Sequence, residues 1–232
     1  MLCFIGDTHG NFGFFRNLPK VIPNELNITF IQVGDFGLWP DMMKSWPDDF
    51  PWKVYFIHGN HDSWNMYHNW NSISKVANNL FYVPNGTMLE LEGLKIGFMG
   101  GGESLDRSMR TEGFDWWPQE RVTLHDVGVF LKKIKKVDVL VSHTPPLNVI
   151  QRHWPPVSKF YWKLPEDWSD VSSLSVEYLR NELDLPPTIC GHMHKSVLDG
   201  NVRILDINEP YFWCGDITKN EVKYDRLAAK IS

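Results

Sequence analysis

The sequence has few cysteines, no long hydrophobic run and no excess of basic residues. Its three cysteines, Cys3, Cys190 and Cys214, are odd in number and widely spaced, so we expect reduced core residues and no disulfide framework. No apolar stretch approaches the ~20 residues that a membrane span needs. A strand already starts at Leu2, which leaves no cleavable targeting segment before it. We therefore expect a cytoplasmic protein without a membrane partner.

The charge balance and the composition narrow the class further. With 23 Lys and Arg against 28 Asp and Glu, the formal net charge is −5 and the isoelectric point is near 6.0. This balance argues against a broad basic face for duplex DNA. No linker rich in Gly, Ser or charge divides the chain, and 43% of the residues are hydrophobic, so we expect residues 1–232 to form a single domain.

What the sequence does contain is a recurring arrangement in which an apolar run ends in side chains that can bind a metal. Five strand-like runs end this way: CFIGDTHG (3–10), FIQVGDFG (30–37), FIHGNHD (56–62), VLVSH (139–143) and TICGHMH (188–194). If these strands lie in one sheet, their carboxyl ends converge on one edge, which is where open α/β sheets place their ligands.

Each of these motifs has an ordinary alternative when it is taken alone. Asp7 could cap a helix, Asp35 and Asn60 could form turns, and a single histidine at a strand end can be structural. Together, however, seven imidazole, carboxylate and amide groups in one desolvated space would be unstable without cations. Nitrogen and oxygen ligands of this kind suit Mn²⁺, Fe, Zn²⁺ or Ni²⁺ better than Ca²⁺, and their number indicates two ions.

Between the motifs, the pattern predicts alternating strands and helices, with hairpins after residue 80. We expect a short helix over residues 11–18 that Pro19 ends, and a helix over residues 63–79. Further helices are expected after the cap formed by Thr123 and Asp126 and over residues 173–183. Three stretches rich in Trp, Pro or Gly are expected to be irregular: residues 39–51, 103–118 and 144–170.

The motifs GDTHG, GDFG, GNHD, SH and GHMH, in this order from Asp7 to His194, resemble the motif series of the calcineurin-like metallophosphoesterases. The resemblance implies an α/β fold, a four-layer α/β/β/α sandwich of mixed sheets with flanking helices. It also implies a ligand set: Asp7, His9 and His194 for one metal, Asn60, His143 and His192 for the second, and Asp35 as a bridge. In that family the residue matching His61 acts at the leaving group, and the residue matching Asp62 orients or tunes it.

Two departures from the phosphoprotein phosphatases of this family narrow the expected substrate. Those enzymes carry GDxxDRG and GNHE where this chain has GDFGLWP and GNHD. The missing second Asp and Arg argue against a phosphoprotein, and the shorter motifs resemble those of phosphodiesterases and nucleases. The later stretch GGESLDRSMRTEGFDWWPQE is similar to bacterial and phage-encoded members, so the expected cytoplasm would be that of a host if the protein is phage-encoded.

We therefore expect a phosphodiesterase for small nucleotide esters, such as 2′,3′-cyclic nucleotides, which the acidic net charge and the compact single domain favour. It would act by attack of a metal-bound hydroxide, with Mn²⁺ as the expected metal. The alternatives are a nuclease that binds single-stranded nucleic acid, a phosphomonoesterase, and a binding scaffold that has lost its chemistry. The scaffold is disfavoured because none of the eight motif positions is replaced.

Substrate contacts are expected from the loops near residues 103–118 and 144–170. The candidate substrate-binding residues are Arg107, Arg110, Trp116 and Trp117. Guanidinium groups suit phosphate oxygens, and indole rings can stack on a base. The alternative for the arginines is a salt bridge with Asp106 or Glu112, and for the tryptophans it is core packing. His58 is expected to be a bystander.

Overall fold

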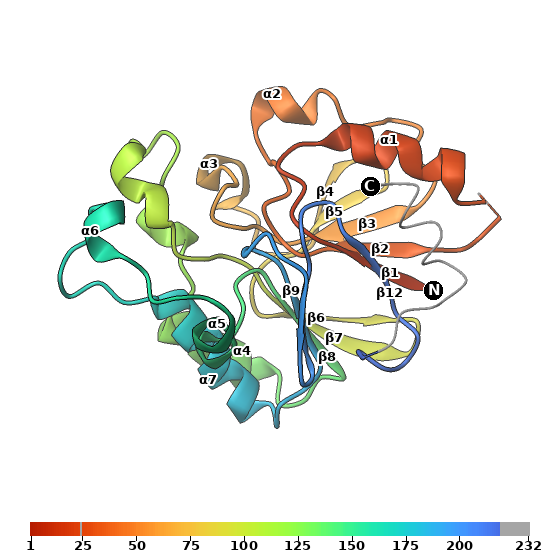
Figure 1. Cartoon of the computed structure of the whole chain (residues 1–232). Helices are drawn as coiled ribbons and strands as arrows, with labels where there is room; N and C mark the ends of the chain where they lie inside the picture. Colours follow the sequence, from red (N-terminus) through yellow and green to blue (C-terminus); the bar gives the residue numbers. More distant parts are fainter. Residues whose placement is uncertain (24, 219–232) are drawn as a thin grey trace.

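The described part of the chain, residues 1–23 and 25–218 of a computed structural model, contains two six-stranded sheets (Figure 1). In spatial order the first sheet consists of β12 (Pro210–Phe212), β1 (Leu2–Ile5), β2 (Thr29–Gln32), β3 (Lys53–Phe56), β5 (Leu80–Tyr82) and β4 (Ser74–Ala77). The second consists of β10 (Val197–Asp199), β11 (Val202–Ile204), β9 (Thr188–Cys190), β8 (Val139–Ser142), β7 (Leu94–Met99) and β6 (Thr87–Leu91).

Each sheet is parallel in its centre and has an antiparallel pair at each edge. In the first sheet, β1, β2, β3 and β5 are parallel, whereas β12 and β4 run the other way. In the second sheet, β7, β8, β9 and β11 are parallel, and β6 and β10 are the antiparallel edges. The register pairs Ile5 with Gln32 and Gln32 with Phe56, so β1, β2 and β3 end side by side.

The alternation of side chains along the strands separates the hydrophobic core into layers. In β1, Leu2 and Phe4 belong to the cluster between the two sheets, whereas Cys3 and Ile5 belong to the cluster under α1 (Phe12–Val21). In β8, Val139 and Val141 face the first sheet, and Leu140 packs with the helices on the outer side. The expected four-layer α/β/β/α sandwich of mixed sheets with flanking helices is therefore confirmed.

Helices cover the outer face of each sheet (Figure 1). The first sheet carries α1 and the short α2 (Pro40–Met43), and α3 (Trp64–Tyr67) lies nearer the site. The second sheet carries α4 (Leu124–Lys133), α5 (Leu147–His153) and α7 (Val171–Glu182), while α6 (Lys159–Trp162) lies further out. Two short 3₁₀ helices, η1 (Leu105–Met109) and η2 (Pro118–Glu120), lie in the stretch expected to be irregular. Thr123 and Asp126 form the expected capping box of α4.

The five motif-bearing strands do not share one sheet, which corrects the geometry considered above. β1, β2 and β3 belong to the first sheet, and β8 and β9 belong to the second. Each of these strands is buried on both faces, with one face against helices and the other against the opposite sheet. A strand of either sheet therefore has the same apolar sequence pattern, and the pattern does not show which sheet the strand joins. The carboxyl ends nevertheless meet, because the two sheets pack face to face with these ends at a common border.

The helix expected over residues 63–79 is also wrong beyond its first turn. α3 ends at Tyr67, and Ser74–Ala77 forms β4, an edge strand of the first sheet. A turn at Asn78 and Asn79, with Asn79 at a φ of 54°, reverses the chain into β5. Trp70, which the expected helix would contain, instead packs against Tyr82 with ring centroids 5.4 Å apart.

Three smaller expectations differ from the structure. α1 continues past Pro19 to Val21, and the N–H of Ile22 donates to Leu18 at 2.9 Å, so the proline removes a single helical bond without ending the helix. The stretch 144–170 contains α5 and α6. Cys3 and Cys190 are buried as expected, but Cys214 is exposed.

No helix among the described residues is long and apolar enough to span a membrane.

Candidate metal centre

Four side chains from both sheets form a compact group of metal-ligand type. Asp7, His9, Asp35 and His194 each offer one ligand atom, and these atoms lie within 4.8 Å of one another. Asp7 follows β1, Asp35 follows β2, and His194 follows β9. The side chains of His9 and His194 are 30% and 42% exposed, whereas the two carboxylates are buried. The group is therefore open to solvent on its histidine side.

The ligand-type atoms of this group lie close enough together for one cation to contact several of them. The Nε2 atoms of His9 and His194 lie 2.9 Å apart, and His194 Nε2 lies 3.1 Å from Asp7 Oδ2. Asp35 Oδ2 is buried and has no hydrogen-bond donor within reach among the described residues. An orphaned carboxylate oxygen beside converging imidazole nitrogens is costly unless a positive charge satisfies it.

A second group lies on the other side of Asp35 and is more deeply buried. Asn60 Oδ1 is 3.0 Å from His143 Nε2, which in turn is 3.4 Å from Asp35 Oδ1. The ring of His192 lies next to that of His143, with centroids 5.0 Å apart. Asp35 therefore directs one oxygen toward each group. Its place between them is the one that the resemblance implied for a bridging ligand.

The backbone holds several of these candidate ligands in conformations that a chain adopts only under constraint. The residues His9, Asp35, His192 and His194 all have positive φ angles, between 46° and 70°. Gly59 is required for close approach, because a Cβ there would lie 2.0 Å from Asp35 Oδ1. His143 Nδ1 lies 3.0 Å from the carbonyl of Val33 and can donate to it, so Nε2 is the ring nitrogen placed to bind a metal.

The electrostatic surroundings act differently on the individual side chains of the candidate site. Burial alone would raise the pKa of Asp35, but the charges of His143, His61 and His9 and the N–H of His61 hold that pKa well below its usual range. Burial, with the neighbouring charge of His143, lowers the pKa of His192 to about 3, so this imidazole is neutral. The hydrogen bond to Asp7 raises the pKa of His194.

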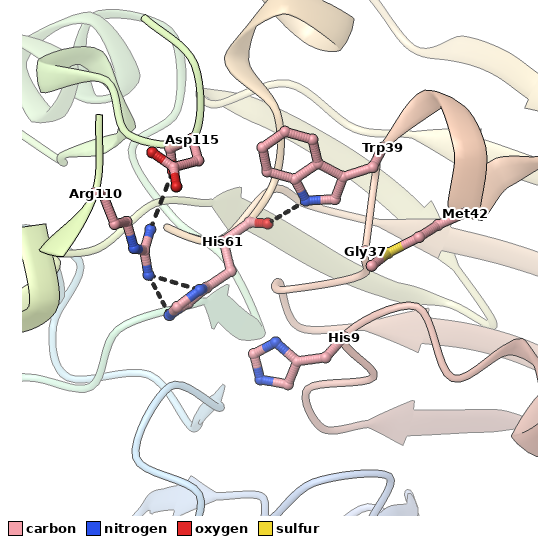
Figure 2. A pocket seen from close by; sticks show the side chains of 7 residues that line it. All are labelled: His9, Gly37, Trp39, Met42, His61, Arg110 and Asp115. Atoms are coloured by element: carbon pink, nitrogen blue, oxygen red, sulfur yellow. Dashed lines mark hydrogen bonds between the residues drawn. The ribbon is translucent and has the colours of Figure 1, made fainter. Parts of the chain in front are cut away.

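His61 lies at the edge of the group and faces a pocket (Figure 2). Its N–H donates to Asp35 Oδ1 at 2.8 Å, and its ring lies 5.4 Å from that of His9, centroid to centroid. Arg110 Nη2 lies 2.6 Å from His61 Nδ1 and 2.7 Å from Nε2, so it can donate to whichever nitrogen lacks a proton. Burial, followed by the opposing effects of Asp35 and Arg110, leaves the pKa of His61 below its ordinary value.

Asp62 contacts the backbone of the two loops that carry Asp35 and Asn60. Its two oxygens accept N–H groups from Phe36, Gly37, Leu38 and Gly59 at 2.7 to 3.1 Å. These bonds tie the loop after β2 to the loop after β3. Direct support of His61 by Asp62 stays a prediction, whereas the contacts give Asp62 a definite part in placing Asp35.

The expected substrate-binding residues divide between the pocket and its surroundings. Arg110 lines the pocket and also forms the salt bridge with Asp106, at 2.8 Å, that was the alternative for it. Arg107 and Trp116 are half-buried and do not line this pocket. Trp117 is 5% exposed and packs on Trp39 with ring centroids 5.9 Å apart, which argues against its stacking on a substrate base.

The pocket also contains residues that the sequence reasoning missed. It has a volume of about 230 Å³ and is lined by His9, Gly37, Trp39, Met42, His61, Arg110 and Asp115. Figure 2 shows Arg110 between Asp115 and His61, with the indole nitrogen of Trp39 turned to the His61 carbonyl at 2.8 Å. The only signal for Trp39 was its position just after the GDFG motif.

His58 is a structural histidine, as expected for a bystander. Its Nδ1 lies 3.0 Å from the Tyr82 hydroxyl, and its ring stacks on Tyr67 with centroids 4.4 Å apart. Burial lowers its pKa to about 3, so the ring packs as a neutral group.

Comparison with known proteins agrees with the motif order and with the geometry of this group. The sequence model described as calcineurin-like phosphoesterase matches residues 2–196, which include all the motif residues discussed above. No curated protein matches the chain significantly. The candidate metal group fits the metal-dependent phosphoester hydrolysis of that family. The chain therefore belongs to the calcineurin-like phosphoesterase family.

Proposed function

We propose that the protein is a phosphodiesterase that hydrolyses small nucleotide esters, such as 2′,3′-cyclic nucleotides. The observation that carries this proposal is the pocket of about 230 Å³ that shares His9 with the metal group and contains His61 and Arg110. A small ester can place its phosphate against the metal group and its leaving group beside His61. The size of the pocket suits part of a small molecule better than a folded protein surface.

The donor atoms of this chain suit two divalent cations, with Mn²⁺ as the proposed metal. Asp7, His9 and His194 would hold one, Asn60, His143 and His192 would hold the other, and Asp35 would contact both. When bound, such ions supply a water of lowered pKa and offset negative charge on the phosphoryl oxygens. The mixture of imidazole, carboxylate and amide ligands without thiolate is typical of Mn²⁺, Fe, Zn²⁺ or Ni²⁺.

Arg110 and His61 would share the work on the rest of the substrate. A phosphate offers the guanidinium two acceptor oxygens, which are stronger partners than an imidazole nitrogen. Arg110 would then bind the phosphate and release His61, which would donate a proton to the departing alkoxide. The salt bridge to Asp106 restricts where the Arg110 side chain can move.

A substrate panel tests the choice of substrate class. Protein freed of metal and reloaded with Mn²⁺ is assayed on bis-nitrophenyl phosphate, nitrophenyl phosphate, 2′,3′-cyclic nucleotides and single-stranded DNA. We expect turnover of the diester and of the cyclic nucleotides. Preference for the monoester would identify a phosphomonoesterase, and preference for DNA a nuclease. No turnover of any of these substrates, either with Mn²⁺ or after reloading with Fe, Zn²⁺ or Ni²⁺, would favour a binding scaffold.

The role of His61 has a separate test. We expect His61→Ala to retain metal binding and to lose about 10²- to 10⁴-fold in turnover of a cyclic nucleotide, because that leaving group needs a proton. The loss on bis-nitrophenyl phosphate should be much smaller, since nitrophenolate leaves unprotonated. His68→Ala is the matched control, because His68 is an exposed histidine outside this pocket. Equal losses on both substrates would contradict the proposed role.

A further inference from the structure

A chain of three buried polar side chains leads from the metal group to the segment after β7. Asn60 Nδ2 donates to Ser104 Oγ at 3.1 Å, and the Ser104 hydroxyl donates to Glu120 Oε1. The other oxygen of Glu120 accepts the N–H of Trp117 at 3.3 Å. Asn60, Ser104 and Glu120 are 3%, 1% and 0% exposed, so water cannot replace these partners freely.

We propose that Ser104 and Glu120 are positioning residues that hold the Asn60 amide with its oxygen toward the second cation. This inference rests on the proposed function, in which Asn60 Oδ1 is a metal ligand. Neither residue reaches the substrate pocket or offers an atom to the metal group itself. Their effect passes through the orientation of one amide.

The need for such a device follows from the shape of asparagine. The two ends of its amide have nearly the same size, so a half-turn exchanges the acceptor Oδ1 with the donor Nδ2. Only the acceptor end can bind a cation. In the observed orientation Oδ1 lies 3.0 Å from His143 Nε2, on the side of the metal group, and the reversed orientation would present N–H groups there.

The direction of the hydrogen bonds selects one orientation. A serine hydroxyl carries one hydrogen, and Glu120 Oε1 accepts it, while the other oxygen of Glu120 accepts the N–H of Trp117. Ser104 Oγ can then offer Asn60 only lone pairs, which an NH₂ group can use and a carbonyl oxygen cannot. Without Glu120, the hydroxyl could turn and donate to Asn60 Oδ1, so that both amide orientations would be accepted.

The glycines before Ser104 bring this segment against the ligand. A Cβ at Gly102 would lie 3.2 Å from Asn60 Oδ1 and 3.3 Å from the His192 ring. Glycine therefore lets the chain pass beside two metal ligands and place Ser104 two residues later. This close approach gives Gly102 a part in placing Ser104.

Metal binding by Ser104→Ala tests the proposal without relying on activity. Mn²⁺ is titrated by calorimetry into the metal-free full-length protein, and the paired ions are followed by electron paramagnetic resonance. We expect wild type to bind two ions and S104A to bind one of them about 10- to 100-fold more weakly, as for other residues that support a metal ligand. The spectrum should shift from a coupled pair toward an isolated Mn²⁺.

Ser172→Ala is the matched control for loss of a buried hydroxyl. Ser172 is 0% exposed and accepts the N–H of Val122 at 3.0 Å, so its removal also costs a buried hydrogen bond. We expect S172A to lower the stability of the metal-free protein while both cations bind as in wild type. If S104A and S172A affect Mn²⁺ binding alike, Ser104 has only a structural role and the proposal is overturned.

Glu120→Gln provides a second variant of nearly unchanged shape. Its amide can donate to Ser104 Oγ, which frees the hydroxyl to donate to Asn60 and permits the reversed orientation. We expect E120Q to weaken the same cation site, by less than S104A. Unchanged binding in both S104A and E120Q overturns this inference alone, whereas a wild-type protein that binds no divalent metal overturns the proposed function as well.

Discussion

At the scale of single residues, buried carboxyl groups near the metal centre differ according to their neighbours. Three histidines hold the pKa of Asp35 low although it is buried. Glu103 is 2% exposed, and burial raises its pKa to about 7, even though Arg121 Nη1 lies 3.7 Å from its Oε1 and acts in the opposite direction. A carboxylate among imidazoles is ready for a cation, whereas one without such neighbours resists ionisation.

Glu103 therefore makes stability fall as the pH rises. The unfolded chain releases this proton near its ordinary pKa of 4.5, but the folded protein releases it near 7, so the penalty is absent at low pH and complete above about pH 8. We expect the unfolding free energy of Glu103→Gln, relative to wild type, to rise by about 2–3 kcal/mol between about pH 4 and pH 8. Urea titrations of both proteins measure it, and a difference independent of pH would refute it.

At the scale of elements, one carboxylate connects the loops that carry Asp35 and Asn60. Asp62 accepts three consecutive N–H groups from residues 36–38 and a fourth from Gly59. The loops after β2 and β3 are thus tied together, although neither contains regular structure at these positions.

Replacing Asp62 with asparagine should break this connection. An amide keeps one acceptor oxygen and turns an NH₂ group toward N–H donors, so Asp62→Asn is expected to lower the unfolding free energy by about 2–4 kcal/mol. Guanidinium titration of metal-free protein measures the loss. Asp41→Asn is the control, because Asp41 is exposed and paired only with Lys44 on the surface. A loss in D62N no larger than in D41N would rule out the tether.

At the scale of the whole molecule, the proposed metal ligands come from both sheets. Asp7, Asp35 and Asn60 follow strands of the first sheet, and His143, His192 and His194 follow strands of the second. Any cation held by these groups links the two halves of the sandwich. Metal binding should therefore stabilise the whole protein and not only the loops.

Metal removal should lower the thermal midpoint of unfolding. At a Mn²⁺ concentration about 100 times the dissociation constant, linkage predicts about 2.7 kcal/mol of stabilisation, which for a chain of this length is a rise of about 5–10 °C. Scanning calorimetry of protein treated with a chelator and then given Mn²⁺ measures this rise. Asp35→Asn should abolish most of it. An equal rise in D35N would place the stabilising ion elsewhere.

Much of the candidate site could be predicted because its residues follow buried strands directly. When an apolar run ends in Gly-Asp, Gly-Asn or Gly-His, the pattern predicts both the end of the strand and a side chain of metal-ligand type after it. Asp7, Asp35 and His194 were found in this way, and the structure brings them together with His9. Trp39 and Asp115 were missed because an ordinary residue in a loop has no pattern of its own.

The amino-acid sequence by itself determined the ligand types, their order and the α/β alternation, because periodicity and turn residues act over a few positions along the chain. Only the tertiary structure decided that the motif strands belong to two sheets, that Ser74–Ala77 is an edge strand, and that Arg110 reaches His61. These features depend on contacts between distant segments. Local sequence patterns do not predict such contacts, because packing energy is gained only when the surfaces of two distant segments meet.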